Sequence, residues 1–509
     1  MRANQIVKYP FIGFLLRRGE GDRCIFIRGL WRSDQKLLIR RCLHIVAFVV
    51  ALGMIPAFKD GLPISMIGIW QAHAVASQID PSTAEPGRET SLSLEQCIQI
   101  ALANNPDIAV RKGEVSQAEA QKEGSRGARW PTIRAAGAYN YYLDAQRLIP
   151  ARENGEPGVF SRTITSAELL LFMPLFTGGQ ITNRIKASEL LLAASENRLA
   201  RTREELIFNV TSVFNAILGQ QKVIGSLLFS IDVLKKQIGR IQDLISLQKG
   251  TKVDLLRTEV RLANLEQRLV QEKNTLLIQQ RVLANLMGLK NSERPVTLVG
   301  ELNFMPLKVE PEVLSPEVYK TRQDYLAAKA ELEAQERRVD VARAGHWPTL
   351  SLRGSYGWRY APSAIPTHIP SDASGMENPH YVGAVGLFVD IPLFEGGQTE
   401  ARIRDELAKL WTQRERLRKL ELQMQLEVET AAANVNSLQQ RILTTEKSIE
   451  QAKESLEIER EKYEVGKSTI TDVLDAQAAL LEAQSIYYRT LADHETAKAQ
   501  LRLAIGGKP

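Results

Sequence analysis

Two long stretches without proline constrain the fold of this chain more than any other feature. One runs from Gln180 to Gln248 and the other from Gln398 to Lys467. At a rise of about 1.5 Å per residue, each stretch is long enough for about 100 Å of helix. An ordinary globular helix has about 11–12 residues, so helices of this length need lateral support. The sequence therefore predicts coiled coils.

Apolar residues recur every seven positions within both stretches, as coiled-coil cores require. The first stretch carries Ile217, Ile224, Ile231, Ile238 and Ile245, with Leu227, Leu234 and Ile241 at the second core position. The second carries Met424, Ala431 and Leu438, interleaved with Val428, Val435, Ile442, Ile449 and Leu456. After the first stretch the pattern returns as Leu255, Leu262, Leu269, Leu276 and Leu283. Turns at 249–252 and 464–469 are expected to fold each helix pair into an antiparallel hairpin.

Each long helix follows a copy of one motif, PLFTGGQ at 174–180 and PLFEGGQ at 392–398. The copies lie 218 residues apart, and Trp-Pro-Thr at 130–132 likewise returns at 347–349. This spacing is typical of a duplicated domain rather than of a short structural repeat. We predict a leader over 1–76, a first repeat over 77–290, a linker over 291–314 and a second repeat over 315–509.

Each repeat is expected to have the order helix, two strands, very long helix, turn, long helix. The first helix opens at Ser93, with Gln96 completing a capping box, and runs to about Gly124. The equivalent helix opens at Ser315-Pro316 and runs to about Gly345. The strands are predicted at 132–143, 164–176, 349–360 and 381–394, lengths that suit strands crossing a membrane.

The duplicated motif has a physical explanation at the strand-to-helix turn. Proline ends a strand where no ladder donor is needed, phenylalanine suits an aromatic girdle at the membrane interface, and paired glycines permit a sharp turn. The residues concerned are Pro174, Phe176, Gly178, Gly179, Pro392, Phe394, Gly396 and Gly397. An ordinary soluble strand-to-helix turn is the alternative interpretation.

Four strands cannot stand alone in a bilayer, because every backbone group at a sheet edge must be paired there. Since the smallest single-chain barrels have about eight strands, the chain is predicted to share its barrel with copies of itself. Three copies would supply twelve strands, and their helices would continue as a tube. A soluble coiled-coil scaffold with a small sheet is the rival architecture.

The first residues have the composition of an export signal. Ten of the 13 charged residues among positions 1–41 are Lys or Arg, and the remaining 468 residues have a net charge of −1. Apolar runs then precede Ala74 and Ala76, which fit a cleavage site before Ser77; a membrane anchor is the alternative. Cleavage would leave Cys97 as the one cysteine, so no internal disulfide is expected. The near-neutral remainder gives no sign of a nucleic-acid partner.

The duplicated plan, the PLFxGG motif and the stretch YEVGKSTITDVLDAQAALLEAQ at 463–484 closely resemble the TolC family of bacterial outer-membrane efflux proteins. The resemblance implies a trimeric twelve-stranded β-barrel continued by a long α-helical periplasmic tunnel. It also implies partners, namely a periplasmic adaptor protein and an inner-membrane pump. By the same resemblance the adaptor docks at the hairpin tips, here Gly250, Thr251, Lys252, Gly466, Lys467 and Thr469.

The second tip also carries candidate gate residues. Asp472 and Asp475 are three apart and project from one side of a helix, so threefold symmetry would form two carboxylate rings that favour cations. The resemblance places Tyr463, Asp254 and Ser468 among contacts that tie the hairpins shut. The family member compared has arginine where this chain has Ser468, which puts a charged latch in doubt. A solvated helix face is the alternative for each acidic residue.

The sequence carries no signature of an enzyme, a metal site or a cofactor. It lacks a complete phosphate-binding loop, an H-E-x-x-H motif and paired cysteines, and its six histidines are scattered. We therefore expect a passive outer-membrane exit duct for small molecules, driven by its partners. Protein export by a type I secretion system is the alternative within the same architecture.

Overall fold

The computed structural model describes residues 92–147, 159–289, 298–307, 318–360, 365–366 and 381–507. The predicted leader, its cleavage site at Ala76 and the predicted helix start at Ser315 lie outside these residues.

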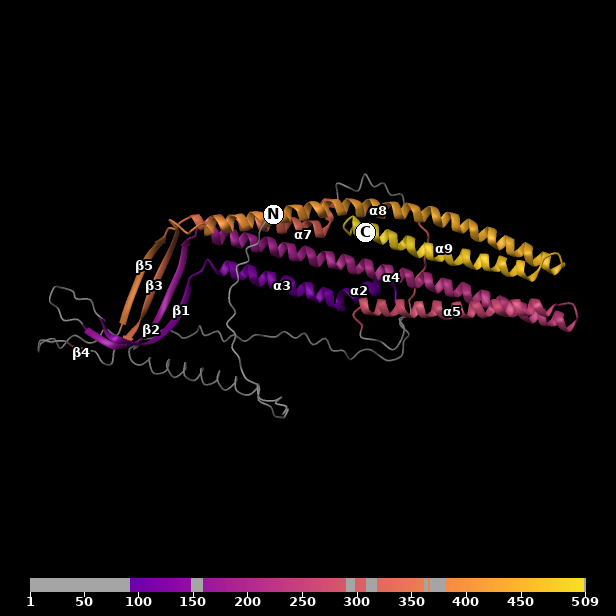
Figure 1. Cartoon of the computed structure of the whole chain (residues 1–509), viewed down its shortest axis with the longest axis horizontal. Coiled ribbons are helices and arrows are strands. Elements are labelled where there is room, and N and C mark those ends of the chain that lie inside the picture. The colour runs from indigo at the N-terminus through magenta and orange to yellow at the C-terminus, as the bar shows by residue number, and fades with distance from the viewer. Residues whose placement is uncertain are drawn as a thin grey trace, which may run out of the picture. The chain divides into compact units, whose positions relative to one another are not determined.

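The two very long helices predicted from the absence of proline are confirmed. They are α4 (Gln180–Ser246) and α8 (Gln398–Glu464), each of 67 residues. Each is followed, after a short turn, by an antiparallel helix of 35 residues: α5 (Lys252–Leu286) follows α4, and α9 (Ile470–Ala504) follows α8. Figure 1 shows the two antiparallel hairpins running alongside each other.

The predicted seven-residue pattern lies in the core of these hairpins. Ile217, Leu227, Leu234 and Ile241 are buried on α4, as are Met424, Val428, Val435 and Ile442 on α8. One core joins the two repeats, because Ile470, Leu474 and Leu481 of α9 pack in the cluster formed by the α4 residues. The hairpins therefore stabilise each other as well as themselves.

The helix predicted over 94–124 is wrong in its continuity, since the structure has α2 (Leu94–Asn104) and α3 (Pro106–Gly127). The capping box at Ser93 and Gln96 is confirmed. The break occurs because the Asn105 side chain accepts a hydrogen bond of 2.8 Å from the backbone N–H of Asp107, and Pro106 takes the first helical position.

The equivalent helix in the second repeat is also interrupted, and α7 covers only Gln323–Arg343. A short 3-10 turn, η1 (Ala344–His346), follows it. The break lies at Arg322, whose side chain is 1% exposed and forms ion pairs with Asp324 (2.6 Å) and Glu427 (2.7 Å). A buried guanidinium needs such partners, and Arg322 forms these ion pairs from an extended backbone that interrupts the helix.

The four predicted strands are present as β1 (Thr132–Arg147), β2 (Val159–Phe176), β3 (Thr349–Tyr360) and β5 (Tyr381–Asp390). They pair antiparallel in the order β1-β2-β3-β5. β1 and β2 extend beyond their predicted ends because they continue to pair after an irregularity. β5 ends before Pro392, and a two-residue strand that was not predicted, β4 (Ile365–Pro366), pairs with β2.

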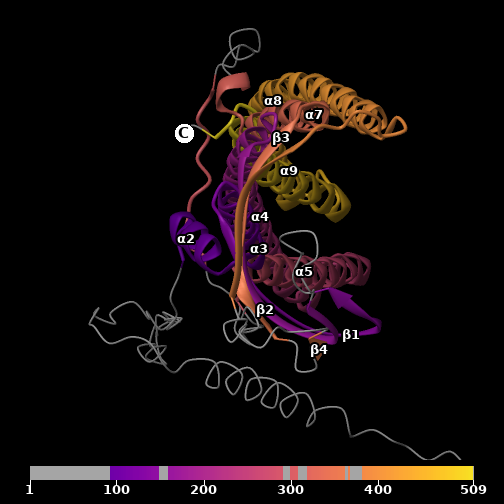
Figure 2. The same ribbon diagram turned by 90° about the vertical axis from the view of Figure 1, so that its left-hand side faces the viewer.

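The two strand pairs share one register. Thr132 faces Phe172 in the first repeat, and their counterparts Thr349 and Asp390 face each other in the second. Seen from the strand end, the sheet is a curved layer (Figure 2). One of its faces is mostly apolar, and the rows across it include Ile133, Leu171, Leu352, Leu387 and Val385.

Candidate functional site at the hairpin tips

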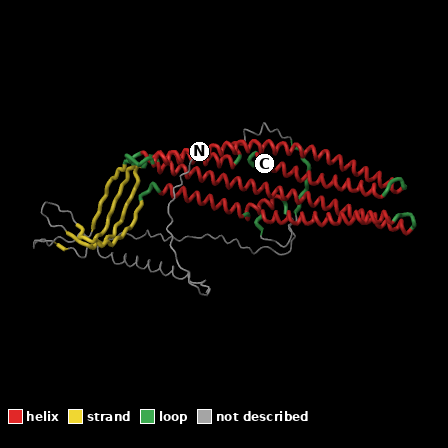
Figure 3. The backbone as a smooth tube through the Cα atoms, in the orientation of Figure 1, coloured by secondary structure: helices red, strands yellow, loops and turns green. Residues whose placement is uncertain are grey.

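Both hairpin tips have the same turn, displaced by 218 residues. α4 ends at Ser246 and α5 begins at Lys252, while α8 ends at Glu464 and α9 begins at Ile470. Figure 3 shows both turns at the helix ends far from the strands. The predicted docking residue Thr251 caps α5, since its hydroxyl oxygen accepts from the backbone N–H of Asp254 (3.1 Å).

The two tip glycines serve different purposes. Gly466 has a φ of 71°, in the left-handed region, and the matching position of the first tip is Gln248 with a φ of 57°. Gly250 is needed for close packing, because a Cβ there would lie 3.0 Å from the Ile245 nitrogen and 3.1 Å from the Leu244 Cβ. Gly250 and Gly466 are therefore not structural counterparts.

The tip surface combines exposed polar and apolar groups. Lys252, Gly466 and Lys467 are exposed, as are Thr251 and Thr469, whereas Gly250 is half-buried. Sequence reasoning missed Leu247 and Val465, which occupy matching positions and are 65% and 67% exposed. The available signal was an apolar residue directly after each long helix, outside its seven-residue pattern.

Asp472 completes a capping box at the start of α9. Its Oδ2 accepts from the Thr469 hydroxyl (2.7 Å), the Thr469 backbone N–H (2.9 Å) and the Ser468 hydroxyl (3.0 Å). The Thr469 hydroxyl and backbone bonds, followed by the Ser468 bond, lower the pKa of this carboxyl. Both Asp472 and Asp475 are exposed on this helix, but within the described residues only Asp472 accepts hydrogen bonds from neighbouring side chains. The two carboxylate rings stay a prediction.

Ser468 lies between two carboxylates rather than in a charged latch. Its hydroxyl is 2.7 Å from Glu459 Oε2 and 3.0 Å from Asp472 Oδ2. A hydroxyl has one proton to donate, so it bonds one of the two at a time. Lys462 also donates to Glu459 (2.8 Å). Glu459 and Lys462 were not identified from the sequence, because only the fold brings them to Ser468.

Tyr463 of α8 lies near Asp254 of α5, so the structure brings these two predicted residues together. Tyr463 is half-buried in the core shared by the hairpins. Burial raises the pKa of its phenol, and the negative charge of Asp254 raises it further. Among the described residues no direct hydrogen bond joins the two side chains.

Two other contacts tie the hairpins together at this level. Arg240 of α4 pairs with Glu464 of α8 at 2.8 Å, and the Arg257 guanidinium of α5 donates to the Thr471 hydroxyl of α9 at 2.9 Å. Both arginine contacts cross from the first repeat to the second. They are long-range in sequence, and no local motif signals them.

The strand-to-helix turns have the predicted backbone. Both glycine pairs have positive φ, at 60° and 86° for Gly178 and Gly179 and at 61° and 81° for Gly396 and Gly397. Phe176 and Phe394 are 47% and 91% exposed. Pro174 still pairs with Ser351 inside β2, so it precedes the strand end rather than marking it.

The two turns differ in what covers them. A Cβ added to Gly178 would come within 2.5 Å of the Trp347 Cβ, whereas a Cβ added to Gly396 would meet nothing described within 4 Å. Trp130, the counterpart of Trp347, is 72% exposed. Among the described residues this glycine–tryptophan contact therefore occurs once, between Gly178 and Trp347, and the matching surfaces at Gly396 and Trp130 stay open.

Comparison with known proteins matches nearly the whole described chain. The sequence model of the family described as "Outer membrane efflux protein" matches residues 97–289 and 314–507. The pyoverdine export outer membrane protein OpmQ of Pseudomonas putida is 26% identical over 432 residues, which cover 82% of this chain and 86% of OpmQ.

Two further similarities agree with this match. The cobalt-zinc-cadmium resistance protein CzcC of Cupriavidus metallidurans is 24% identical over 339 residues, covering 66% of this chain and 75% of CzcC. The crystal structure of the CmeC outer membrane channel of Campylobacter jejuni superposes with a TM-score of 0.70 at 15% identity, covering 89% of this chain and 93% of CmeC.

Proposed function

The chain belongs to the outer membrane efflux protein family, and on this premise we propose that three copies join their sheets into one twelve-stranded barrel. The contact between Gly178 and Trp347 carries this proposal. It joins the first repeat to the second, and the matching surfaces at Gly396 and Trp130 lie open. A closed ring of copies would place Trp130 of one copy over Gly396 of the next.

The sheet edges support the same ring. β1 and β5 are the outer strands of the described sheet, and lipid cannot satisfy their free backbone groups. Leu169 of β2 faces Tyr356 of β3. Leu387 is the counterpart of Leu169 in the second repeat, and Tyr139 is the counterpart of Tyr356 in the first. In the ring, Leu387 of one β5 would therefore face Tyr139 of the neighbouring β1. Both side chains belong to the sheet face that would meet lipid.

We propose that the resulting tube is a passive exit duct for small molecules. The export and metal-resistance relatives OpmQ and CzcC favour a small cargo. The free energy for transport would come from an inner-membrane pump, reached through a periplasmic adaptor docked at the hairpin tips. Leu247 and Val465 give that adaptor an apolar contact at each tip, with lysines beside it.

A disulfide between copies tests this ring. Leu387→Cys combined with Tyr139→Cys should give covalently linked copies on oxidation in membranes, because facing strand residues lie within disulfide reach. The matched control, Leu387→Cys with Asn140→Cys, places the second cysteine on the opposite face and should stay monomeric on a denaturing gel. A folded, membrane-embedded protein that yields only monomer with the first pair would refute the ring.

A further inference from the structure

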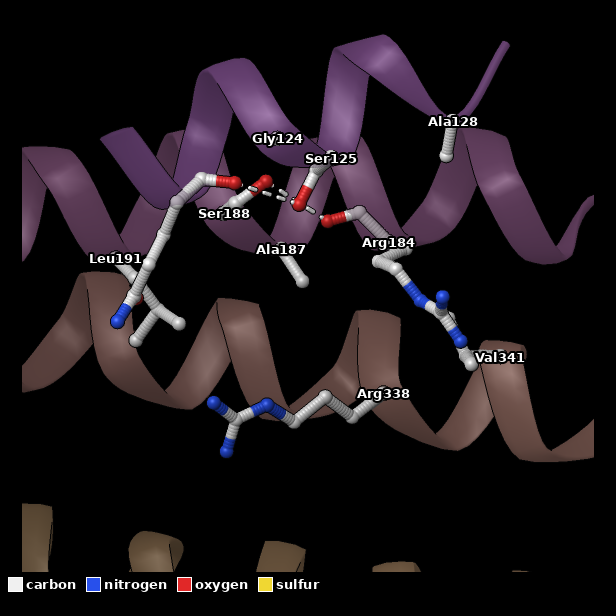
Figure 4. Close-up of a pocket in the computed structure, with 10 residues that line it drawn as sticks. Gly124, Ser125, Ala128, Arg184, Ala187, Ser188, Leu191, Arg338 and Val341 are labelled. Carbon is white, nitrogen blue, oxygen red and sulfur yellow. Dashed lines mark hydrogen bonds between the residues drawn. The ribbon is translucent and has the colours of Figure 1, made fainter. Parts of the chain in front are cut away.

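Two grooves open on opposite faces of α4 close to the strands. The first, a cavity of about 500 Å³ between α3, α4 and α7, has Arg184 and Arg338 among its lining residues (Figure 4). The second, of about 570 Å³, lies between α3 and α4 and includes Lys186. Arg184 and Lys186 are two residues apart, about 200° around a helix, which separates the two grooves.

The second groove combines positive charge with an apolar wall. Its carboxylate, Glu189, is already paired with Arg126 at 2.7 Å. Arg129 and Lys186 form no ion pair with any carboxylate of the described residues, so two positive charges are left without a partner. Trp130, Met173 and Ile185 form the apolar wall. The groove is thus suited to a ligand with an anionic group and a hydrocarbon part.

The position of Met173 shows which side of the sheet this groove adjoins. Met173 faces Leu352 across the β2–β3 pair, on the same side as Leu171. That apolar side meets lipid in the barrel, a step that rests on the proposed function. The groove therefore continues from the lipid-facing surface at the level where strands pass into helices, which is the membrane interface.

The aromatic and basic residues of the groove recur in the second repeat. Each of these four residues has a counterpart 217 or 218 positions later that keeps its aromatic or basic character. Arg126, Arg129, Trp130 and Lys186 correspond to Arg343, His346, Trp347 and Arg404. Tryptophan beside basic residues is typical of membrane–water interfaces, and the repetition places such a cluster beside both strand-to-helix turns.

We propose that the second groove binds an anionic phospholipid of the periplasmic leaflet. Arg129 and Lys186 would contact the headgroup phosphate, and the acyl chain would follow Met173 onto the apolar sheet face. Trp130 would lie at the level of the headgroup while also packing over Gly396 of the neighbouring copy, as Trp347 stays 59% exposed while it contacts Gly178. The groove in Figure 4 opens on the other face of α4, away from Met173, and serves as the matched control surface.

Native mass spectrometry of the full-length protein tests this site. The protein is reconstituted in phosphatidylcholine containing phosphatidylglycerol, released in mild detergent, and the retained lipids are counted. The wild type should retain phosphatidylglycerol in preference to phosphatidylcholine. Arg129→Gln with Lys186→Gln should lower that affinity by about thirtyfold, given the usual contribution of two basic residues at an anionic surface. The control, Arg184→Gln with Arg338→Gln, should retain lipid as the wild type does.

Each contrary outcome has a distinct meaning. Equal phosphatidylglycerol retention by the Arg129 and Lys186 variant would overturn the lipid site. Displacement of the lipid by inorganic phosphate alone would reassign the groove to a free anion, which also overturns it. A wild-type protein that does not form membrane-embedded trimers would instead refute the proposed function.

Discussion

Trp347 lies so close to Gly178 that no side chain fits on the glycine, and this contact joins the second repeat to the first. Gly178→Ala should destabilise the single chain by about 2 kcal/mol or more, because a left-handed alanine costs about 1–2 kcal/mol and its Cβ also meets Trp347. Thermal unfolding followed by circular dichroism measures this loss.

Gly396→Ala should instead act on assembly. The added Cβ meets no described atom of the same chain within 4 Å. The single chain should therefore lose only the about 1–2 kcal/mol of stability that a left-handed backbone costs an alanine. In the ring, the same Cβ would collide with Trp130 of the neighbouring copy. At equal folded fraction, native mass spectrometry should therefore detect fewer trimers of Gly396→Ala than of Gly178→Ala. Equal trimer yields would contradict the proposed contact of Gly396 with Trp130 of the neighbouring copy.

Apolar groups at both tips should contribute to adaptor docking. Leu247→Ser with Val465→Ser removes two exposed apolar side chains, and we expect at least tenfold weaker binding of the adaptor with an unchanged trimer. Biolayer interferometry with the purified adaptor measures the affinity. Leu228→Ser with Phe229→Ser, which changes exposed apolar residues of α4 away from the tip, is the control and should bind normally.

The two candidate gate carboxylates should differ in their effect on conduction. Both carboxylates are exposed, but that of Asp472 accepts hydrogen bonds from Thr469 and Ser468. The Asp475 carboxylate has no such bond among the described residues, so its charge is more available to ions. Asp475→Asn should therefore lower cation selectivity and block by trivalent cations more than Asp472→Asn does. Planar-bilayer recordings decide this, and identical currents in wild type and both variants would place these carboxylates outside the conduction path.

His494 should make the helices sensitive to mild acid. It is fully buried, and neither ring nitrogen forms a well-aligned hydrogen bond with a described residue, although Nδ1 lies 3.5 Å from Glu495 Oε1. Burial lowers the pKa of this imidazole below its ordinary value of 6.5, against the opposing effect of Glu495. The unfolded chain therefore binds a proton that the folded chain does not, and stability is lost as the pH falls below about 6.5.

His494→Leu should remove this sensitivity. It eliminates two buried ring nitrogens that lack well-aligned hydrogen bonds to described residues, so we expect the free energy of unfolding to rise by about 1–2 kcal/mol at neutral pH. Melting temperatures measured at pH 7.5 and 5.5 should then converge. A variant that keeps the wild-type pH dependence would show that another group is responsible.

Much of this fold was readable because it depends on local rules. Glycine pairs, absent prolines and seven-residue spacing identified α4 and α8 almost to the residue. The break at Asn105-Pro106 carried a readable signal, an N-cap followed by proline, that the longer amphipathic pattern obscured. The break at Arg322 was harder to read, since one of the two carboxylates that pair with its guanidinium, Glu427, is distant in sequence.

In the candidate site, too, local features could be predicted from the sequence and contacts between distant residues could not. Thr469 and Asp472 have capping-box spacing, and their hydrogen bonds follow from local sequence. The contacts of Arg240 with Glu464 and of Arg257 with Thr471 required the hairpins to be placed side by side. Propensity and spacing describe single elements, so contacts between the repeats stayed hidden until the fold was known.

The equal lengths of α4 and α8, 67 residues each, set one common distance between the strands and both hairpin tips. At about 1.5 Å per residue, adding one seven-residue unit would lengthen a helix by about 10 Å. Because each long helix packs against its returning partner and against the other repeat, such a change must be made in all four helices together. The two repeats therefore jointly constrain the length of the helices. An insertion in one helix alone would be expected to distort the hairpin that contains it.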